Sequence, residues 1–451
     1  MNWSRPEDRL AGLSRRRFLQ GALAGLASSL LPRRVMTASR YRVGVGKDAD
    51  PYVATLRALD ACSEWPPPEL FGRQVIIKPN LVVQASPETG AVTDPQVVRA
   101  IVDTALAAGA AEVLIAEGAK GGEYFSACGY DFFQSYDPAG RVALVNLDEQ
   151  PATLVAVPDG LAYRQIYLPE LVLDAEAYLI SVAKLKCHVE TLVTLSMKNL
   201  FGLPPLQRYQ HAEATVQSRF AMHERGVNQA IVDLNLARPI DFAVVDGIWG
   251  MEGDGPWEGD PVRMDMVIAG RNALAVDLVC LQAMDVPQSQ VQHLAYAVEK
   301  GLGPADASSI DVLGDPFSPK TFRLPTIPPF IERPRAIPSV FAPDRGEGTA
   351  IVYWVDRPCW TRVEIIRTSD LTSDVTAVRL LRGWTLRLAG RDILIWDGRD
   401  DQGQLVPEGE YTIHIEATGG EVSRNHAHAT GWVSVVAEEM SQRAYLPAVL
   451  R

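Results

Sequence analysis

Val75-Ile76-Ile77-Lys78 is the segment that decides the fold: three β-branched residues in a row, closed by a lysine. Such a run is typical of a strand that is buried on both faces of a sheet. A helical pattern follows over residues 95–108, with Pro95 in its first turn, and a second apolar run, EVLIA, occupies residues 112–116. Strand, helix and strand at this spacing predict a unit with two parallel strands.

The alternation of strand and helix continues to about residue 318. Apolar strands are expected at residues 178–182 and 242–245, and helices at residues 212–236, 272–284 and 289–300. This alternation is typical of domains in which helices cover a mostly parallel sheet. We therefore predict a layered α/β domain over residues 41–318.

Proline crowds the next segment, residues 319–345, which suits an extended connector. Residues 346–437 then carry short alternating segments, separated by turn signals such as Asp397-Gly398 and Gln402-Gly403. Short strands at close spacing predict an all-β, immunoglobulin-like sandwich. A tail over residues 438–451 would follow it.

The N-terminal segment, residues 1–40, has the order of an export signal. Ser14-Arg15-Arg16-Arg17-Phe18-Leu19 matches the twin-arginine pattern, and a short stretch rich in alanine and glycine follows it. We expect the twin-arginine translocase to be a partner and the protein to reach the periplasm or cell surface. No clean cleavage site is present, so a leader that persists as an anchor is the alternative.

Composition excludes some classes of protein. The chain of 451 residues has 47% hydrophobic and 22% charged residues, the profile of a globular protein with two folded units. Its formal net charge of −12 argues against nucleic acid as a partner, since phosphates would be repelled. The five cysteines are scattered, and this spacing argues against an iron–sulfur cluster or a zinc ribbon.

The C-terminal stretch WDGRDDQG at residues 396–403, followed by VPEGEY at 406–411, resembles the FlgD-type immunoglobulin-like domain. The resemblance implies an accessory or spacer module, through which a cell-envelope partner could dock. Trp396 and Tyr411 are expected to pack in its core, while glycine and aspartate set tight turns. Calcium ligation by these aspartates is the alternative interpretation.

Five motifs are spread over residues 43–315: IKPNL at 77–81, TDP at 93–95, KLKCH at 184–188 with LSMKNLFG at 195–202, VDG at 245–247 with MEGDGP at 251–256, and ALAVD at 273–277. Together they resemble the domain-of-unknown-function family 362. That family has no settled activity. Some members carry an appended iron–sulfur segment, which this chain lacks.

Basic and amide side chains fall at the ends of the expected strands, where ligands of open α/β sheets bind. Alternating residues of a strand face the same side, so Lys184, Lys186 and His188 would point together. Several lysines at one sheet edge predict a pocket for a carboxylate or phosphate of a small anionic molecule. The alternative is that they are solvated or pair with local acids. The predicted substrate-binding residues are Lys78, Asn80, Lys184, Lys198, Asn199 and Glu252.

His188 is the predicted general acid or base because its charge ordinarily switches near neutral pH, and Lys186 and Asp246 complete the predicted catalytic set. Glu117, Asp246 and Asp277, with His188, could instead hold a divalent metal. The competing interpretation is that these acids only cap helices or neighbouring elements. His211 and His223 are expected in a lid over the site.

Three functions follow from these patterns. The first is an exported enzyme acting on a small anionic substrate, with redox, isomerase and lyase chemistry all open and metal assistance as an option. The second is a non-catalytic binding or assembly protein of the cell envelope. The third is an iron–sulfur redox protein, which the scattered cysteines argue against because they give no ligand framework for a cluster.

Overall fold

A computed structural model describes residues 40–118, 122–210, 219–368, 377–419 and 426–437. The expected export signal, the expected C-terminal tail and His211 lie outside these ranges. Tyr41–Arg451 forms one compact unit. Within the described ranges we find no helix with both the length and the apolar character needed to cross a bilayer.

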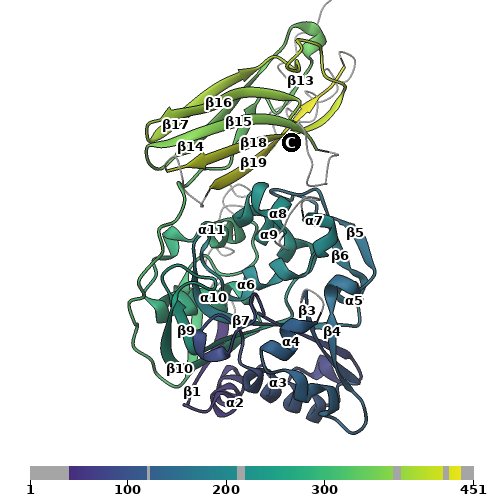
Figure 1. Cartoon of the computed structure of the whole chain (residues 1–451), viewed down its shortest axis with the longest axis vertical. Helices are drawn as coiled ribbons and strands as arrows, with labels where there is room; N and C mark the ends of the chain where they lie inside the picture. Colours follow the sequence, from purple (N-terminus) through teal and green to yellow (C-terminus); the bar gives the residue numbers. More distant parts are fainter. Residues whose placement is uncertain (1–39, 119–121, 211–218, 369–376, 420–425, 438–451) are drawn as a thin grey trace, which may run out of the picture. The chain divides into compact units, whose positions relative to one another are not determined.

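A nine-stranded sheet forms the centre of the α/β part (Figure 1). The pairs β2–β3, β2–β7, β3–β4, β7–β9 and β1–β11 are parallel, whereas β10 runs antiparallel to both β1 and β9. The predicted, largely parallel sheet is therefore confirmed. Its strand order is β11 (Ile310–Gly314), β1 (Tyr41–Lys47), β10 (Asp260–Gly270), β9 (Phe242–Glu252), β7 (Tyr178–His188), β2 (Gln74–Pro79), β3 (Glu112–Glu117) and β4 (Val142–Asn146), with β8 (Leu192–Val193) paired to β7.

Strand β2 explains why the sheet lies at the centre. Val75 and Ile77 enter one hydrophobic core, Ile76 enters the other, and all three are fully buried. Because successive side chains of a strand point to opposite faces, an uninterrupted apolar run is stable only where both faces are covered. The run VII therefore requires helices on each side of the sheet.

Helices cover both faces (Figure 1). On one side lie α2 (Pro51–Cys62) and α3 (Pro95–Ala107), whose N-termini are capped by the side chains of Asp50 and Asp94. On the other side lie α6 (Leu195–Asn199), α9 (Val227–Ala237), α10 (Ala273–Met284) and α11 (Gln292–Glu299). The helices expected at residues 95–108, 272–284 and 289–300 are present within a few residues of the predicted bounds.

Two expected elements differ from the structure. The helix predicted over residues 212–236 is broken: α8 spans Phe220–Glu224 and α9 begins only at Val227, because Gly226 between them has φ +102°. Strands β7 and β9 each continue well beyond their predicted apolar runs, to 11 residues. The extension places the second half of each strand, which carries the polar motifs, inside the sheet.

The C-terminal part contains two further sheets that share one hydrophobic core. Trp396 and Tyr411 are buried in it with ring centroids 5.4 Å apart, as expected for core residues. The proline-rich segment contributes short edge strands, where the missing N–H groups of proline are tolerated. The sheets are β12 (Arg335–Ile337), β14 (Thr349–Val355) and β17 (Gly390–Trp396), and β13 (Val340–Phe341), β19 (Ala427–Val435), β18 (Gly409–Thr418), β15 (Cys359–Arg367) and β16 (Arg379–Arg387).

The fold predicts a strong effect of substituting Asp233, a buried carboxylate on α9. It accepts hydrogen bonds from three consecutive backbone N–H groups, those of Leu161, Ala162 and Tyr163, at 2.6, 2.7 and 2.8 Å. Asp233→Ala leaves these buried donors without an acceptor, so we expect a loss of about 2–4 kcal/mol in the free energy of unfolding. Urea denaturation measures it. Asp60→Ala, at an exposed position on α2, is the matched control, and equal losses in both variants would refute this assignment.

Candidate functional site

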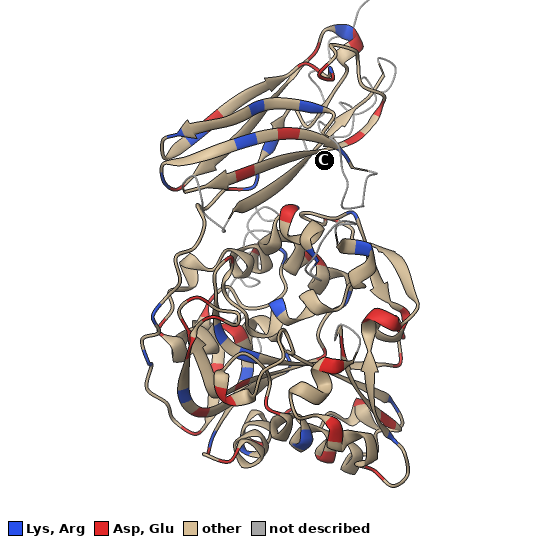
Figure 2. Cartoon of the chain, viewed as in Figure 1, with Lys and Arg blue, Asp and Glu red and all other residues tan. Residues whose placement is uncertain are grey.

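A cavity of about 1000 Å³ lies at the carboxyl ends of β2, β3 and β7. This is where ligands bind in open α/β sheets, and the volume lies at the upper end of the usual range for small-molecule sites. Basic residues gather in this interior region, around α6 and β7 (Figure 2). The predicted residues that line the cavity are Lys78, Asn80, Glu117, Lys186, His188, Lys198 and Asn199.

Lys78, the second-last residue of strand β2, forms a buried ion pair with Glu117, which ends the neighbouring parallel strand β3. The Lys78 Nζ to Glu117 Oε1 distance is 2.7 Å, and Glu117 also accepts the backbone N–H groups of Leu81 and Gly118. Burial lowers the pKa of Lys78, against the opposing attraction of Glu117. With its charge matched, Lys78 is a fixed part of the cavity floor.

Two asparagines connect Lys78 to Lys186. Asn199 Oδ1 accepts from Lys78 Nζ at 3.4 Å and from Asn80 Nδ2 at 3.1 Å. Asn80 Oδ1 in turn accepts from Lys186 Nζ at 2.8 Å. Since Asn199 Nδ2 donates to the backbone oxygen of Lys78 and to Ser181 Oγ, both amides have assigned orientations and are held in place. The motifs IKPNL, KLKCH and LSMKNLFG thus meet in one hydrogen-bond network.

Lys186 is fully buried, and neutral oxygens alone hold its amine. Besides Asn80, Nζ donates to the backbone oxygens of Ala91 at 2.6 Å and Pro256 at 3.2 Å. Three acceptors match the three N–H donors of an ammonium group. Burial lowers the pKa of Lys186, and the charges of Lys198 and Lys184 lower it further. A nearby anion would raise the pKa of Lys186 again, because it would stabilise the charged form.

Lys198 differs from the other three lysines. It is 8% exposed, it lines the cavity, and Nζ donates no hydrogen bond to any residue in the described ranges. The centroid of the Phe201 ring lies 5.3 Å from Nζ. Burial lowers its pKa to about 8, with a smaller contribution from the positive charge of Lys78. The cavity therefore contains one buried amine that is free to meet a ligand.

His188 lies at the end of β7 and also lines the cavity. Its Nδ1 accepts the backbone N–H of Glu190 at 3.1 Å, which assigns the ring proton to Nε2. Burial and the charge of Lys198 hold its pKa well below the usual range. The ring is thus neutral near pH 7. The surroundings of His188 therefore do not fit the prediction that its charge switches near neutral pH. They suit a neutral ring that donates a hydrogen bond from Nε2.

Lys184 and Asp246 do not line the cavity. They form a separate, fully buried ion pair with an Nζ to Oδ2 distance of 2.7 Å. Asp246 also accepts the backbone N–H groups of Asp94 and Ile248. Burial and the charge of Asp246 raise the pKa of Asp94 to about 6. Lys184, predicted to bind substrate, and Asp246, predicted to be catalytic, therefore do not reach the cavity. For Lys184 the alternative interpretation, that it pairs with a local acid, describes the structure.

The three acids predicted to hold a metal are not brought together. Asp277 is buried on α10 and accepts the backbone N–H groups of Ser196 and Met197, so it caps α6. Burial raises its pKa to about 7. Glu117 and Asp246 are each bound to a lysine, and no cluster of three metal-ligating side chains occurs in the described part of the chain. Glu252 contacts Arg323 and lies outside the cavity lining.

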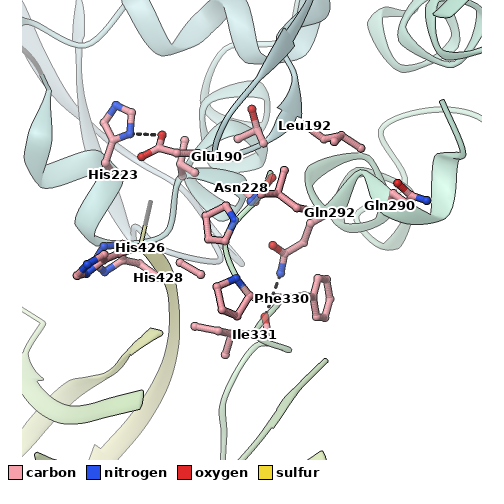
Figure 3. A pocket seen from close by; sticks show the side chains of 16 residues that line it. Glu190, Leu192, His223, Asn228, Gln290, Gln292, Phe330, Ile331, His426 and His428 are labelled. Atoms are coloured by element: carbon pink, nitrogen blue, oxygen red, sulfur yellow. Dashed lines mark hydrogen bonds and ion pairs between the residues drawn. The ribbon is translucent and has the colours of Figure 1, made fainter. Parts of the chain in front are cut away.

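Two further ion pairs lie at the cavity. Arg219 forms a buried ion pair with Asp148 at 2.9 Å, joining segments 71 residues apart, and sequence patterns pointed to neither residue. His223, which was expected in a lid over the site, lines the cavity and contacts Glu190 at 2.6 Å; Figure 3 shows the two side chains facing each other. Glu190 and His223 also border a second hollow of only about 40 Å³, enough for water but not for an organic ligand. The pairing of His223 with Glu190 was not predicted from the sequence.

Comparisons with known proteins agree with part of this description. Residues 75–282 match the family described as a domain of unknown function (DUF362), which confirms the expected resemblance over that range. The chain is 27% identical to a thylakoid-associated protein of Synechocystis sp. over 248 residues, 54% of this chain and 73% of the relative.

Likeness to solved structures is weak. An alkylpurine DNA glycosylase of Pseudomonas fluorescens shares 14% identity with a TM-score of 0.17, and the match covers 24% of this chain and 30% of that one. A β-glucosidase of Erythrobacter marinus shares 10% identity with a TM-score of 0.16, covering 87% of this chain and 49% of that one. TM-scores this low support no conclusion about the fold or the activity of this protein.

The site predicts that Gly202 cannot be enlarged. A Cβ atom there would lie 2.6 Å from Glu117 Oε1 and 2.7 Å from Lys78 Nζ, so Gly202→Ala must separate or displace the buried ion pair. We expect a loss of about 1–3 kcal/mol in stability. Thermal unfolding measures this loss against Gly383→Ala, where a Cβ would meet nothing within 4 Å. Two variants with the same unfolding midpoint would contradict the close packing described here.

Proposed function

We propose that this protein binds a small anionic molecule in the cavity at the ends of β2, β3 and β7, and that it is an enzyme acting on that molecule. The observation that carries the proposal is an excess of buried basic side chains over carboxylates around the cavity. Lys78 and Arg219 are matched by Glu117 and Asp148, whereas Lys186 and Lys198 have no carboxylate within ion-pair distance in the described ranges. Buried charge is unfavourable unless it is compensated, and a ligand carboxylate or phosphate would compensate it.

The donors available to such a ligand differ in kind. Lys198 Nζ and His188 Nε2–H are the groups that can contact it directly. Lys186 contributes mainly through its charge, because its N–H groups are already used by protein oxygens. This division of roles, with fixed charge in the floor and free donors above it, is typical of sites that bind an anion and act on a neighbouring group.

The proposal predicts ligand binding that depends on Lys198. Inorganic phosphate, pyruvate and succinate are titrated against the protein, with the unfolding midpoint as the readout. A ligand at one hundred times its Kd stabilises the native state by about 2.7 kcal/mol. We expect Lys198→Met to remove most of this stabilisation and added salt to weaken it.

Lys320→Met, at an exposed lysine, is the matched control and should bind as the unmodified protein does. Removing Lys198 leaves no described residue without a hydrogen-bond partner, so a simple folding defect is not expected. If none of the three anions shifts the midpoint, or if Lys198→Met binds them unchanged, the proposal fails and the non-catalytic envelope role becomes the better account.

Export by the twin-arginine route is also part of the proposal, supported by Ser14-Arg15-Arg16-Arg17-Phe18-Leu19. We expect the protein in the periplasmic or membrane fraction of a bacterial host with an intact twin-arginine translocase. Replacing Arg15 and Arg16 with lysine should retain it in the cytoplasm, as should a host without the translocase. Cell fractionation with immunodetection measures this, and export that survives both changes would disprove the route.

A further inference from the structure

Of the four buried lysines, Lys198 is the one whose amine has no partner among the described residues. Lys78 and Lys184 are paired with carboxylates, and the three N–H donors of Lys186 are taken by protein oxygens. Lys198 has neither kind of partner among the described residues, although only 8% of it is exposed. An amine buried to this degree and left without a partner is costly unless a ligand uses it.

The surroundings of Lys198 make its amine easier to deprotonate than that of an exposed lysine. Its pKa is lowered to about 8, chiefly by burial; the charge of Glu190 opposes this shift and the positive charge of Lys78 adds to it. The centroid of the Phe201 ring lies 5.3 Å from Nζ, so the ring covers one side of the amine. A lysine that is desolvated and close to another cation is the usual form of a nucleophilic lysine, because a substantial part of it carries a free lone pair near neutral pH.

The rest of the cavity supplies what a carbonyl substrate needs. Lys186, which has no carboxylate partner, would supply positive charge in the floor when a carboxylate or phosphate binds. Lys78 adds little net charge, because Glu117 matches it. His188 is neutral and carries its proton on Nε2, so it can donate a hydrogen bond to a carbonyl oxygen. The two asparagines hold the floor rigid, which fixes the distance between the bound anion and the free amine.

We propose that Lys198 is a nucleophile that forms an imine with an anionic aldehyde or ketone, such as a short 2-oxo acid. This inference rests on the proposed anion-binding function and adds to it a substrate class and a covalent step. It requires no oxidant, reductant or metal.

The step balances as an addition followed by loss of water. The lone pair of Nζ attacks the carbonyl carbon, and the electron pair of the C=O bond moves to oxygen, where His188 Nε2–H stabilises it. Nitrogen loses one proton and oxygen gains one, giving a carbinolamine. The C–O bond then breaks as oxygen takes up a second proton and the lone pair of nitrogen forms the C=N bond; nitrogen releases its remaining proton, which replaces the one taken up by oxygen, and one water leaves. Amine and carbonyl are thus converted to imine and water.

Reductive trapping tests the proposal on the full chain. The protein is incubated separately with glyoxylate, pyruvate and pyridoxal 5′-phosphate in the presence of cyanoborohydride, which converts an imine to a stable secondary amine. Peptide mass spectrometry then locates the adduct. We expect at least one of the three probes to label Lys198 in the unmodified protein and in Lys320→Met, at least tenfold faster than any exposed lysine. Acetone, which lacks an anionic group, should not label it.

The dependence on pH gives an independent readout. Labelling of Lys198 should rise with pH and level off above its pKa of about 8, because only the uncharged amine reacts. An exposed lysine has an ordinary pKa near 10.4, so its labelling should still be rising there. A Lys198 profile parallel to that of Lys320 would count against the proposal.

Succinate and inorganic phosphate separate this inference from the proposed function. Neither has an aldehyde or ketone carbon, so each can stabilise the unmodified protein by anion binding but cannot form an imine. Stabilisation of the unmodified protein by the probes without any Lys198 adduct would overturn the imine and leave anion binding standing. The absence of both stabilisation and adduct would overturn the two together.

Discussion

The need to compensate buried positive charge shapes the centre of this protein. Four lysines lie at or near the carboxyl ends of parallel strands, each 8% exposed or less. A charge removed from water is tolerated only if it meets an opposite charge or a full set of acceptors. Carboxylates supply the first solution for Lys78 and Lys184, and neutral oxygens supply the second for Lys186. Lys198 receives neither from the described residues, which is why the chemistry concentrates there.

The fold brings these groups together through a few long-range contacts. Strand β7 continues past the edge of its apolar run and carries Lys184, Lys186 and His188 into the sheet. Short helix α6 then turns Lys198 and Asn199 back toward the strand ends, and Asp277 from α10 fixes its first turn. No side chain of the cavity floor is positioned by its own segment alone, so the floor forms only when the whole sheet has assembled.

Sequence patterns predicted the architecture well and the site only in part. The runs at β2 and β3 are apolar over both faces, so a covered parallel sheet followed directly from them. The sequence also identified the lysines as site candidates, because lysine is rarely buried within apolar segments unless it is paired. It did not identify the residues with which they pair. In the pairing of β7 with β9, Lys184 lies opposite Asp246, and a register shift then places Lys186 opposite Met251; no local pattern encodes this pairing. Arg219 and Asp148 were missed for the same reason, since only the tertiary fold joins them.

The immobility of Lys186 has a consequence for recognition. Its amine is held by Asn80, Ala91 and Pro256 before any ligand arrives, so the floor is preorganised. Ordering a free lysine side chain on binding costs about 0.5–1.5 kcal/mol, and here that entropy is already lost in folding. Such a site would gain little from induced fit. It would discriminate among anions by shape, rejecting those whose charge cannot reach a cation that does not move.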